Sequence, residues 1–497
     1  IVAVVFVVGV FMDVLDTTIV NVALPEMAQE FGVGRTTLEW IVTGYLCSLA
    51  VWIPASGWIG DRFGTKRTFL FALGMFTLAS ALCASAWNIE SLIAFRVLQG
   101  VGGGMLVPVG TAMLFRAFPP IERAKASSVL AIPTVLAPAL GPVLGGLLVT
   151  HASWHWIFLV NIPIGVAGFV FGALFLEEHR EPRAGGFDAW GFVLSGAGLA
   201  LVLYALAEAP TAGWGSAEVL STLLGGLACF ALLVVIELRV REPMLHLRLY
   251  GNRLFRSTSI AAFTSMGSLI GLVFLLPFFL QELRGLSALE SGLATFPQAL
   301  GMMTLARPVG RLYPHVGPRR LMVGGLIATA LVTSCFVMID LDTNLWWIRL
   351  LMFCRGMTMA FAFIPIQAAS FATIEPSETG RASSLFSTQR QVGAAFGVAV
   401  LATLLATRTD SLVSAALGEG ELAITNARVT AFHQAMFGSA VIAAVGVVAA
   451  LFVRDSDAAP SMRPRPAAPP AADDAEAHSA VPGGVAAPVS PRPSASP

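Results

Sequence analysis

Long apolar runs recur along nearly the whole chain and are separated by short polar segments. A bilayer core of about 30 Å needs about 20 consecutive apolar residues per helix. Runs of this kind occupy residues 1–25, 38–59, 67–87, 89–115, 126–149, 154–176, 188–207, 217–237, 256–281, 290–312, 320–339, 345–371, 382–406 and 432–453. The pattern predicts an all-α polytopic membrane protein with about 14 transmembrane helices.

Composition agrees with a chain whose solvent is mostly lipid. Hydrophobic residues make up 56% and charged residues only 12% of the 497 positions, whereas soluble domains carry about 25% charged residues. The formal net charge is zero, so nothing indicates a basic surface for nucleic acid. The five cysteines lie within apolar stretches at no metal-like spacing, and we expect neither a disulfide framework nor a metal or other cofactor. The chain begins with Ile1 rather than Met, so we expect a short N-terminal piece to be missing.

Basic residues are distributed unevenly between alternate loops. One set of loops holds about 18 Lys and Arg residues and the other set about four, and the richer set is the cytoplasmic one by the positive-inside rule. This predicts a multi-pass protein of the cytoplasmic (inner) membrane with both termini in the cytoplasm.

The two halves of the chain resemble one another. GWIGDRFGTKR at 57–67 aligns with GRLYPHVGPRR at 310–320, and ERAKASS at 122–128 aligns with ETGRASS at 378–384. Chance similarity of helix-end glycines and basic loops is the alternative. A true repeat predicts a six-helix N-terminal lobe at 1–176 and a six-helix C-terminal lobe at 251–453, as secondary transporters have. Residues 177–250 then form a linker region with two extra transmembrane helices, and the Pro/Ala-rich tail at 454–497 is predicted to be disordered.

These stretches resemble the major facilitator superfamily, and in particular its 14-helix drug:proton antiporters of the EmrB/QacA type. LDTTIVNVALP at 15–25 resembles the first-helix motif of that family, and RVLQGVG at 96–102 resembles its fourth-helix motif. GPVLGG at 141–146 and WHWIFLVNIPIG at 154–165 are also similar to this subfamily. The resemblance implies the major facilitator fold, no enzyme activity, and export driven by the proton gradient.

Two aspartates interrupt the first apolar run. Asp13 and Asp16 are three positions apart, so they share one face of a helix. Ionisable residues inside a membrane are functional hypotheses by default, and burial raises a carboxylate pKa whereas a nearby arginine lowers it. The family pattern makes Arg96 the opposing charge and Asp16 the proton site. A static Asp–Arg pair that only fixes helix packing is the alternative, and Asp13 remains either a second proton site or a contact for a cationic substrate.

Two further motifs receive roles from the resemblance. The loop between the second and third helices is expected to act as a conformational latch, because positive-inside topology explains its basic residues but not its aspartate. The latch residues are Gly57, Asp61, Arg62, Gly64, Lys66 and Arg67. The second copy of this motif, at 310–320, contains no acid. The antiporter motif of the fifth helix contains Gly141, Pro142, Gly145 and Gly146; ordinary close packing of helices explains these residues physically.

Polar and flexible side chains in the spans are candidates for a wide apolar substrate cavity. They are Gln99, Met105, Gln281, Gln298, Arg355 and Gln389. No GxxxxGK[ST] phosphate loop occurs, which argues against ATP-driven transport by this chain. We therefore expect a monomeric proton-coupled exporter of amphipathic, cationic or aromatic drugs and toxic compounds. The sequence does not tell whether a periplasmic adaptor protein extends the export path. The alternatives are a dedicated exporter of one endogenous metabolite, such as a self-made antibiotic, fatty acid or amino acid, and a non-transporting membrane sensor.

Overall fold

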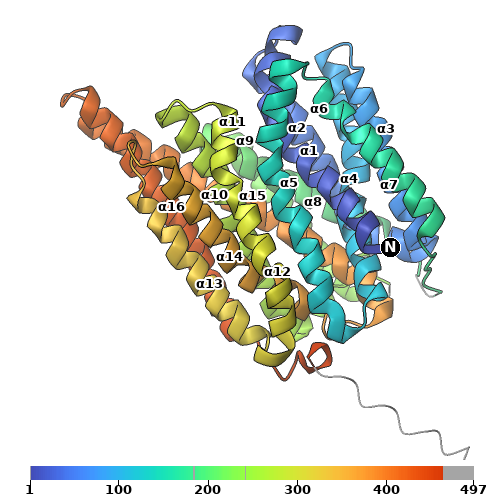
Figure 1. Cartoon of the computed structure of the whole chain (residues 1–497). Helices are drawn as coiled ribbons and strands as arrows, with labels where there is room; N and C mark the ends of the chain where they lie inside the picture. Colours follow the sequence, from blue (N-terminus) through green and yellow to red (C-terminus); the bar gives the residue numbers. More distant parts are fainter. Residues whose placement is uncertain (1, 183–184, 241, 463–497) are drawn as a thin grey trace, which may run out of the picture. The chain divides into compact units, whose positions relative to one another are not determined.

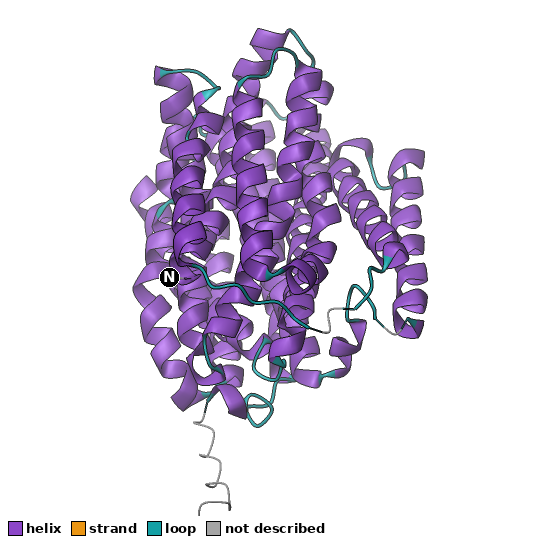
Figure 2. Ribbon diagram, turned by 90° about the vertical axis from the view of Figure 1, so that its right-hand side faces the viewer, coloured by secondary structure: helices purple, strands orange, loops and turns teal. Residues whose placement is uncertain are grey.

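The computed structural model describes residues 2–182, 185–240 and 242–462, and this part of the chain contains helices and no strand (Figure 2). Thirteen of the described helices are long and apolar enough to cross a membrane. The predicted run at 290–312 supplies a further span in two pieces, because α11 (Ala288–Thr295) and α12 (Pro297–Val316) divide it. The all-α fold with about 14 spans is confirmed.

The N-terminal group of helices runs from α1 to α7 (Figure 1). Its members are α1 (Val2–Phe31), α2 (Arg35–Phe63), α3 (Thr65–Ala84), α4 (Ile89–Ala117), the 3-10 turn η1 (Pro120–Glu122), α5 (Arg123–His151), α6 (Trp156–Leu159) and α7 (Asn161–Phe175). Helices α6 and α7 share the predicted run at 154–176. We refer to α1–α7 as the N lobe.

The C-terminal group runs from α10 to α16 and is drawn in green-yellow to red in Figure 1. Besides α11 and α12 it contains η2 (Leu247–Gly251), α10 (Arg253–Phe278), the π-turn η3 (Phe279–Leu283), α13 (Pro318–Ser334), η4 (Cys335–Met338), α14 (Leu345–Ser370), η5 (Pro376–Glu378), α15 (Thr379–Ala416), α16 (Glu421–Leu451) and η6 (Ala459–Ser461). We refer to α10–α16 as the C lobe. Helix α15 is longer than its predicted span at 382–406, because the helix continues past the apolar residues.

Helices α8 (Ala189–Ala212) and α9 (Ala217–Arg239) lie between the two groups in sequence. Helix α8 packs against α2, where Gly196 lies close to Val51. The indole N–H of Trp214, in the turn after α8, donates to Thr403 Oγ1 of α15 at 2.8 Å. The inserted pair therefore contacts a helix of each lobe.

The repeat seen in the sequence has a structural counterpart at the helix ends. Gly64 and Gly317 precede α3 and α13 with φ of 102° and 89°, a region that glycine occupies without steric cost. A carboxylate accepts hydrogen bonds from the first turn of each of these helices: Glu178 from the backbone N–H of Lys66 at 3.0 Å, and Asp455 from that of Arg319 at 2.9 Å. Both halves thus cap their third helix with an acid that follows their last helix.

This second cap also explains the order just after α16. The sequence predicts disorder from residue 454 onward, but Ser461 shares a buried hydrogen bond of 2.8 Å with Tyr313. The structured chain therefore extends past the predicted boundary at 453. Residues 463–497 lie outside the described residues, as do 183–184 and 241 of the linker region, so disorder of the remaining tail stays a prediction.

Both ends of the described chain lie at the same end of the helix bundle. Phe6 of α1 lies close to Gly110 near the end of α4, and Arg253 Nε at the start of α10 donates to the carbonyl of Phe452 at 3.2 Å. The loops around Gly64 and at 118–122 and 371–378 are at this end, as are the described parts of the segments that flank α8 and α9, at 176–182, 185–188 and 242–252 (Figure 1). We call it the arginine-rich end, because it carries most of the Lys and Arg residues in loops.

Candidate functional site

An ion pair lies buried in the middle of the N lobe. Asp16 of α1 and Arg96 of α4 are 0% and 1% exposed, and Arg96 Nη1 donates to Asp16 Oδ2. Arg96 Nη1 also donates to Gln99 Oε1 at 2.6 Å, and Gln99 Nε2 donates to Asp16 Oδ1 at 3.0 Å. Gln99 follows Arg96 by three positions, so α4 presents both side chains on one face toward α1.

Two further helices complete the surroundings of Asp16. Asn161, at the start of α7, donates to Asp16 Oδ1 at 3.4 Å and to Ser80 Oγ of α3 at 3.1 Å. Arg96 Nε donates to the carbonyl of Ile41 in α2 at 3.2 Å. The carboxylate of α1 therefore contacts α4 and α7 directly, and it is connected to α2 through Arg96 and to α3 through Asn161.

Asp13 lies one turn from Asp16 and has a different partner. The Tyr45 hydroxyl of α2 donates to Asp13 Oδ1 at 2.6 Å. The Arg96 guanidinium lies over the Tyr45 ring, 4.1 Å from its centroid, so the ring connects the two aspartate sites. A Cβ at Gly103 would lie 2.7 Å from both Asp13 Oδ1 and the Tyr45 hydroxyl, and glycine is therefore needed there.

The structure brings together Asp13, Asp16 and Arg96, and their role in proton coupling stays a prediction. Tyr45, Asn161 and Ser80 were not among the candidates from the sequence. Asn161 belongs to the WHWIFLVNIPIG stretch that carried the resemblance, so a signal for it existed. Nothing in the sequence pattern distinguished Tyr45 or Ser80 from ordinary residues of an apolar helix.

The loop motif lies at the arginine-rich end. Asp61, which is 2% exposed, accepts a hydrogen bond of 2.7 Å from Arg116 Nη2 at the end of α4. The same guanidinium donates through Nε to the carbonyl of Pro376 in η5 of the C lobe at 3.2 Å. Asp61 thus positions an arginine that contacts the opposite lobe.

The other predicted latch residues lie around Glu178 or at the surface. Arg62 and Arg67 are exposed, and Gly64, Lys66 and Arg67 contact Glu178.

The two lobes touch closely beside Asp61. A Cβ at Gly57 would lie 2.6 Å from the carbonyl oxygen of Gly380, and Ser56 Oγ is 2.9 Å from Ser384 Oγ. Arg123 at the start of α5 donates to the Phe371 carbonyl, and the ring of Phe371 stacks on Phe115 with centroids 4.4 Å apart. These contacts hold the lobes together at the arginine-rich end in this conformation.

The motif in α5 packs between helices of both lobes. A Cβ at Gly141 would lie 2.1 Å from Thr18 Oγ1, and one at Gly145 would lie 3.1 Å from Ile19. Both glycines therefore allow α1 to pack closely against α5. Pro142 lies beside Gly292 of α11, and Gly146 lies near Leu289 of the same helix. Close packing explains all four residues, and their role in coupling stays a prediction.

The six candidates for a substrate cavity do not form one group. Gln99 belongs to the Asp16 network, Met105 is buried in the core of the N lobe, and Gln281 is exposed on η3. Gln389 accepts a hydrogen bond from the Tyr250 hydroxyl at 2.9 Å. The structure brings together only Gln298 and Arg355, whose Nη1 donates to Gln298 Oε1 at 2.8 Å.

Gln298 lines a small cavity between the lobes. Its wall also includes Thr134 and Pro138 of α5, Leu269 of α10 and Met352 of α14. The cavity measures about 20 Å³, which is room for about one water molecule. A drug-sized ligand needs a site of about 300 Å³ or more, so the lobes must separate to admit one here.

A polytopic bundle of two repeated helical lobes is typical of secondary membrane transporters. The sequence model of the Major Facilitator Superfamily matches residues 6–398. The chain belongs to this superfamily.

Several bacterial proteins are similar to the chain over most of its length. The multidrug resistance protein B homolog of Mycobacterium tuberculosis is 37% identical over 396 residues, which covers 79% of this chain and 73% of that protein. The putative multidrug resistance protein MdtD of Cronobacter sakazakii is 36% identical over 401 residues, which covers 80% and 84%. The uncharacterized MFS-type transporter YhcA of Bacillus subtilis is 33% identical over 401 residues, which covers 81% and 75%.

A solved structure shares the fold. The crystal structure of the human organic anion transporter MFSD10 superposes with a TM-score of 0.58 at 17% identity and covers 89% of this chain and 98% of its own. The predicted major facilitator fold is thereby confirmed. Membership of the superfamily, shown by the family model, makes the chain a multi-pass membrane transporter.

Proposed function

We propose that the protein is a proton-coupled antiporter that exports amphipathic drugs, antibiotics or toxic compounds across the cytoplasmic membrane. The observation that carries the proposal is the fully buried ion pair of Asp16 with Arg96. An ionised carboxylate in a membrane interior is costly unless it is paired, and such residues mark proton and ion pathways. The multidrug-resistance names of the relatives support the substrate class.

The geometry of the pair supports a mechanism for coupling. Protonation of Asp16 removes the charge that compensates the Arg96 guanidinium, and a buried charge that loses its partner is strongly destabilised. Gln99 and Asn161 hydrogen-bond the same carboxylate, so α1, α4 and α7 must readjust together. Proton binding therefore favours a different arrangement of the N lobe, and Asp13 provides a second carboxylate one turn nearer the arginine-rich end.

The contacts between the lobes provide the other half of the cycle. In the described conformation the lobes meet at Gly57 and Gly380, and the Arg116 side chain held by Asp61 reaches Pro376. Separation of these contacts opens the arginine-rich end to substrate. We propose that this end faces the cytoplasm, because the positive-inside rule assigns it there, and that both termini are cytoplasmic.

We further propose the partners of the protein and its oligomeric state. Substrate and protons are the partners, together with the lipid bilayer, and the protein acts as a monomer without cofactor, nucleic acid or enzymatic activity. Co-purification would test whether the protein binds a periplasmic adaptor.

The test measures accumulation of a fluorescent amphipathic dye in bacteria that lack their own efflux pumps. Cells with the wild-type protein should retain less dye, and an uncoupler should abolish the difference. Asp16→Asn should also abolish the difference in retained dye. The matched carboxylate-to-amide change Glu208→Gln, near the end of α8, should leave the difference unchanged. Efflux that survives both the uncoupler and Asp16→Asn would refute proton coupling through this residue.

A further inference from the structure

The C lobe has an unusual balance of charge in its interior. Helices α10, α12, α13 and α14 contain no Asp or Glu at all. The only acids in α15 and α16 are Asp410, near the end of α15, and Glu421, the first residue of α16. Arg355 and Arg390 nevertheless lie in the middle of α14 and α15. The acids of η3 and α11, Glu282 and Glu290, are exposed. Buried charges in a membrane are normally paired, and here the long helices of the lobe supply no acid in their middle for the pairing.

Arg355 satisfies its hydrogen bonds without neutralising its charge. The side chain is 0% exposed, and it donates from Nε to Thr333 Oγ1 at 3.1 Å and from Nη2 to the Ser268 carbonyl at 2.8 Å. Gln298 accepts the third bond. All three acceptors are neutral, so Arg355 leaves a net positive charge behind Gln298, which faces the cavity between the lobes.

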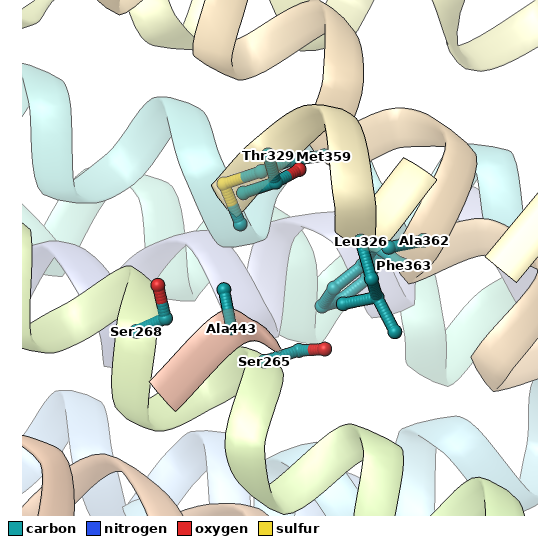
Figure 3. Close-up of a pocket in the computed structure, with 8 residues that line it drawn as sticks. All are labelled: Ser265, Ser268, Leu326, Thr329, Met359, Ala362, Phe363 and Ala443. Carbon is teal, nitrogen blue, oxygen red and sulfur yellow. The ribbon is translucent and has the colours of Figure 1, made fainter. Parts of the chain in front are cut away.

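The region around Ser268 is polar but small. Figure 3 shows the side chains of Ser265 and Ser268 beside Thr329, Met359 and Phe363 around a second cavity within the C lobe. This cavity measures about 10 Å³, which is at most room for one water molecule. An anion that compensates the positive charge must therefore come from the space between the lobes.

Arg390 has the more open position. Its guanidinium lies over the Phe363 ring, 5.3 Å from the centroid, and its buried Nε has no hydrogen-bond partner among the described residues. Neither Arg390 nor Arg355 forms an ion pair within the described part of the chain. Part of the Arg390 side chain remains accessible, whereas Arg355 is sealed.

Helix periodicity places Arg390 on the face of α15 that meets the N lobe. Ser383 Oγ donates to the carbonyl of Pro108 in α4 at 2.7 Å, and a position seven residues later shares its face. Arg390 is then about 10 Å deeper in the bundle than Ser383, at a rise of 1.5 Å per residue. Gly103, which borders Asp13, lies about 7 Å from Pro108 along α4 by the same measure. Arg390 is therefore at nearly the depth of the buried carboxylates, but on the opposite lobe.

The two aspartates in the middle of the N lobe are already occupied. Asp16 is paired with Arg96, and Asp13 accepts from the Tyr45 hydroxyl. Away from the arginine-rich end, the described interior of the two lobes thus holds three arginines (Arg96, Arg355 and Arg390) against two aspartates, and the excess positive charge belongs to the C lobe.

We propose that the substrates carry an anionic group, such as a carboxylate, which pairs with Arg390 while their apolar part packs in the space between the lobes. The inference rests on the proposed export function and names its substrate class. It reverses the cationic preference expected from the aspartates alone. Arg390 is the binding residue. Arg355 does not contact the substrate, and its charge raises the positive potential behind Gln298.

The charge of the substrate has a consequence for energetics. Export of an anion and entry of a proton both make the cell interior more positive. A membrane potential that is negative inside therefore drives both movements. Export of a cation in exchange for one proton would be electrically neutral. The potential dependence of transport therefore distinguishes the two substrate classes.

The test uses three fluorescent probes with one ring system: 1-pyrenebutanoic acid, its methyl ester and 1-pyrenemethylamine. Binding to the purified wild-type protein in detergent is measured by fluorescence anisotropy. The acid should bind about tenfold or more tightly than the ester or the amine, because a charge-assisted hydrogen bond is formed only with the acid. Arg390→Gln should lower the affinity for the acid to that for the ester and leave the affinity for the ester unchanged. Arg390→Lys should retain part of the preference for the acid.

Arg349→Gln is the matched control, because it removes an arginine of α14 that lies near the end of the helix against Trp346. It should leave all three affinities unchanged. Equal affinities of wild type for acid and ester, a preference for the amine, an equal loss of all three in Arg390→Gln, or no binding of any probe would overturn the inference. Proton-driven export of the ester or amine without the acid would also overturn it, yet would leave the proposed function intact; absence of any uncoupler-sensitive export would remove the proposed function itself.

Discussion

Gly57→Ala tests whether the close approach of α2 and α15 holds the described conformation. The new Cβ would lie 2.6 Å from the Gly380 carbonyl oxygen and 2.7 Å from Ser384 Oγ. The serine can rotate, but the backbone oxygen belongs to a helix and cannot move alone. Overpacking of this kind costs about 1–3 kcal/mol.

The clash exists only while the lobes are in contact at the arginine-rich end. The cost therefore falls on this conformation and not on one in which the lobes have separated there. A difference of about 1–3 kcal/mol corresponds to roughly a 5- to 150-fold shift of the equilibrium toward separation.

Spin labels on exposed residues of the two lobes report the shift. Ala117 at the end of α4 and Ser377 of η5 are exposed and lie beside the contact of Arg116 with Pro376. With the five native cysteines replaced, double electron–electron resonance between labels at these positions should show a longer distance gaining population in Gly57→Ala.

Gly324→Ala is the matched control. Gly324 lies in a membrane helix, α13, and a Cβ there would meet nothing within 4 Å. Its distance distribution should equal that of the parent protein. If Gly57→Ala gives the same distribution as Gly324→Ala while both remain folded, the reasoning about the α2–α15 contact is refuted.

Two further predictions concern stability. Asp16→Asn should lower the midpoint of thermal unfolding, because breaking a buried pair costs about 3–5 kcal/mol, and adding Arg96→Gln should recover part of the loss; simple additivity of the two changes would contradict the ion pair. Asp455→Ala should lower the midpoint by removing the cap of α13, worth about 0.5–2 kcal/mol, whereas Asp457→Ala should leave it nearly unchanged; equal effects would show that the cap contributes nothing.

The sequence predicts the architecture well because membrane insertion imposes a strong constraint on it. Every span needs a long apolar run, and loops near the membrane record orientation in their Lys and Arg content. The repeat was visible for a local reason: Gly64 and Gly317 need a backbone conformation that other residues rarely adopt. Asp455 was missed, because its role depends on a chain that turns back to a helix 136 residues earlier.

The site was predictable only in part, because helix periodicity gives a face and not a neighbour. It placed Asp13 and Asp16 together, whereas the contact of Asp13 with Tyr45 depends on how α1 and α2 pack. Gln389 shows the same limit: its position in a span suggested a cavity, yet Tyr250, from outside the spans, takes its amide oxygen. The excess positive charge of the C lobe was present in the sequence, but its meaning depended on the absence of an ion-pair partner for Arg355 and Arg390 among the described residues.

Substrate-dependent proton release tests the central claim, that Asp16 couples protons to transport, most directly. The purified protein is placed in weakly buffered detergent solution with a pH indicator dye, and an exported amphipathic compound is added. The wild-type protein and the Asp13→Asn variant should both release protons when the compound binds, and Asp16→Asn should bind the compound without release. Proton release by Asp16→Asn equal to that of the wild type would contradict the account.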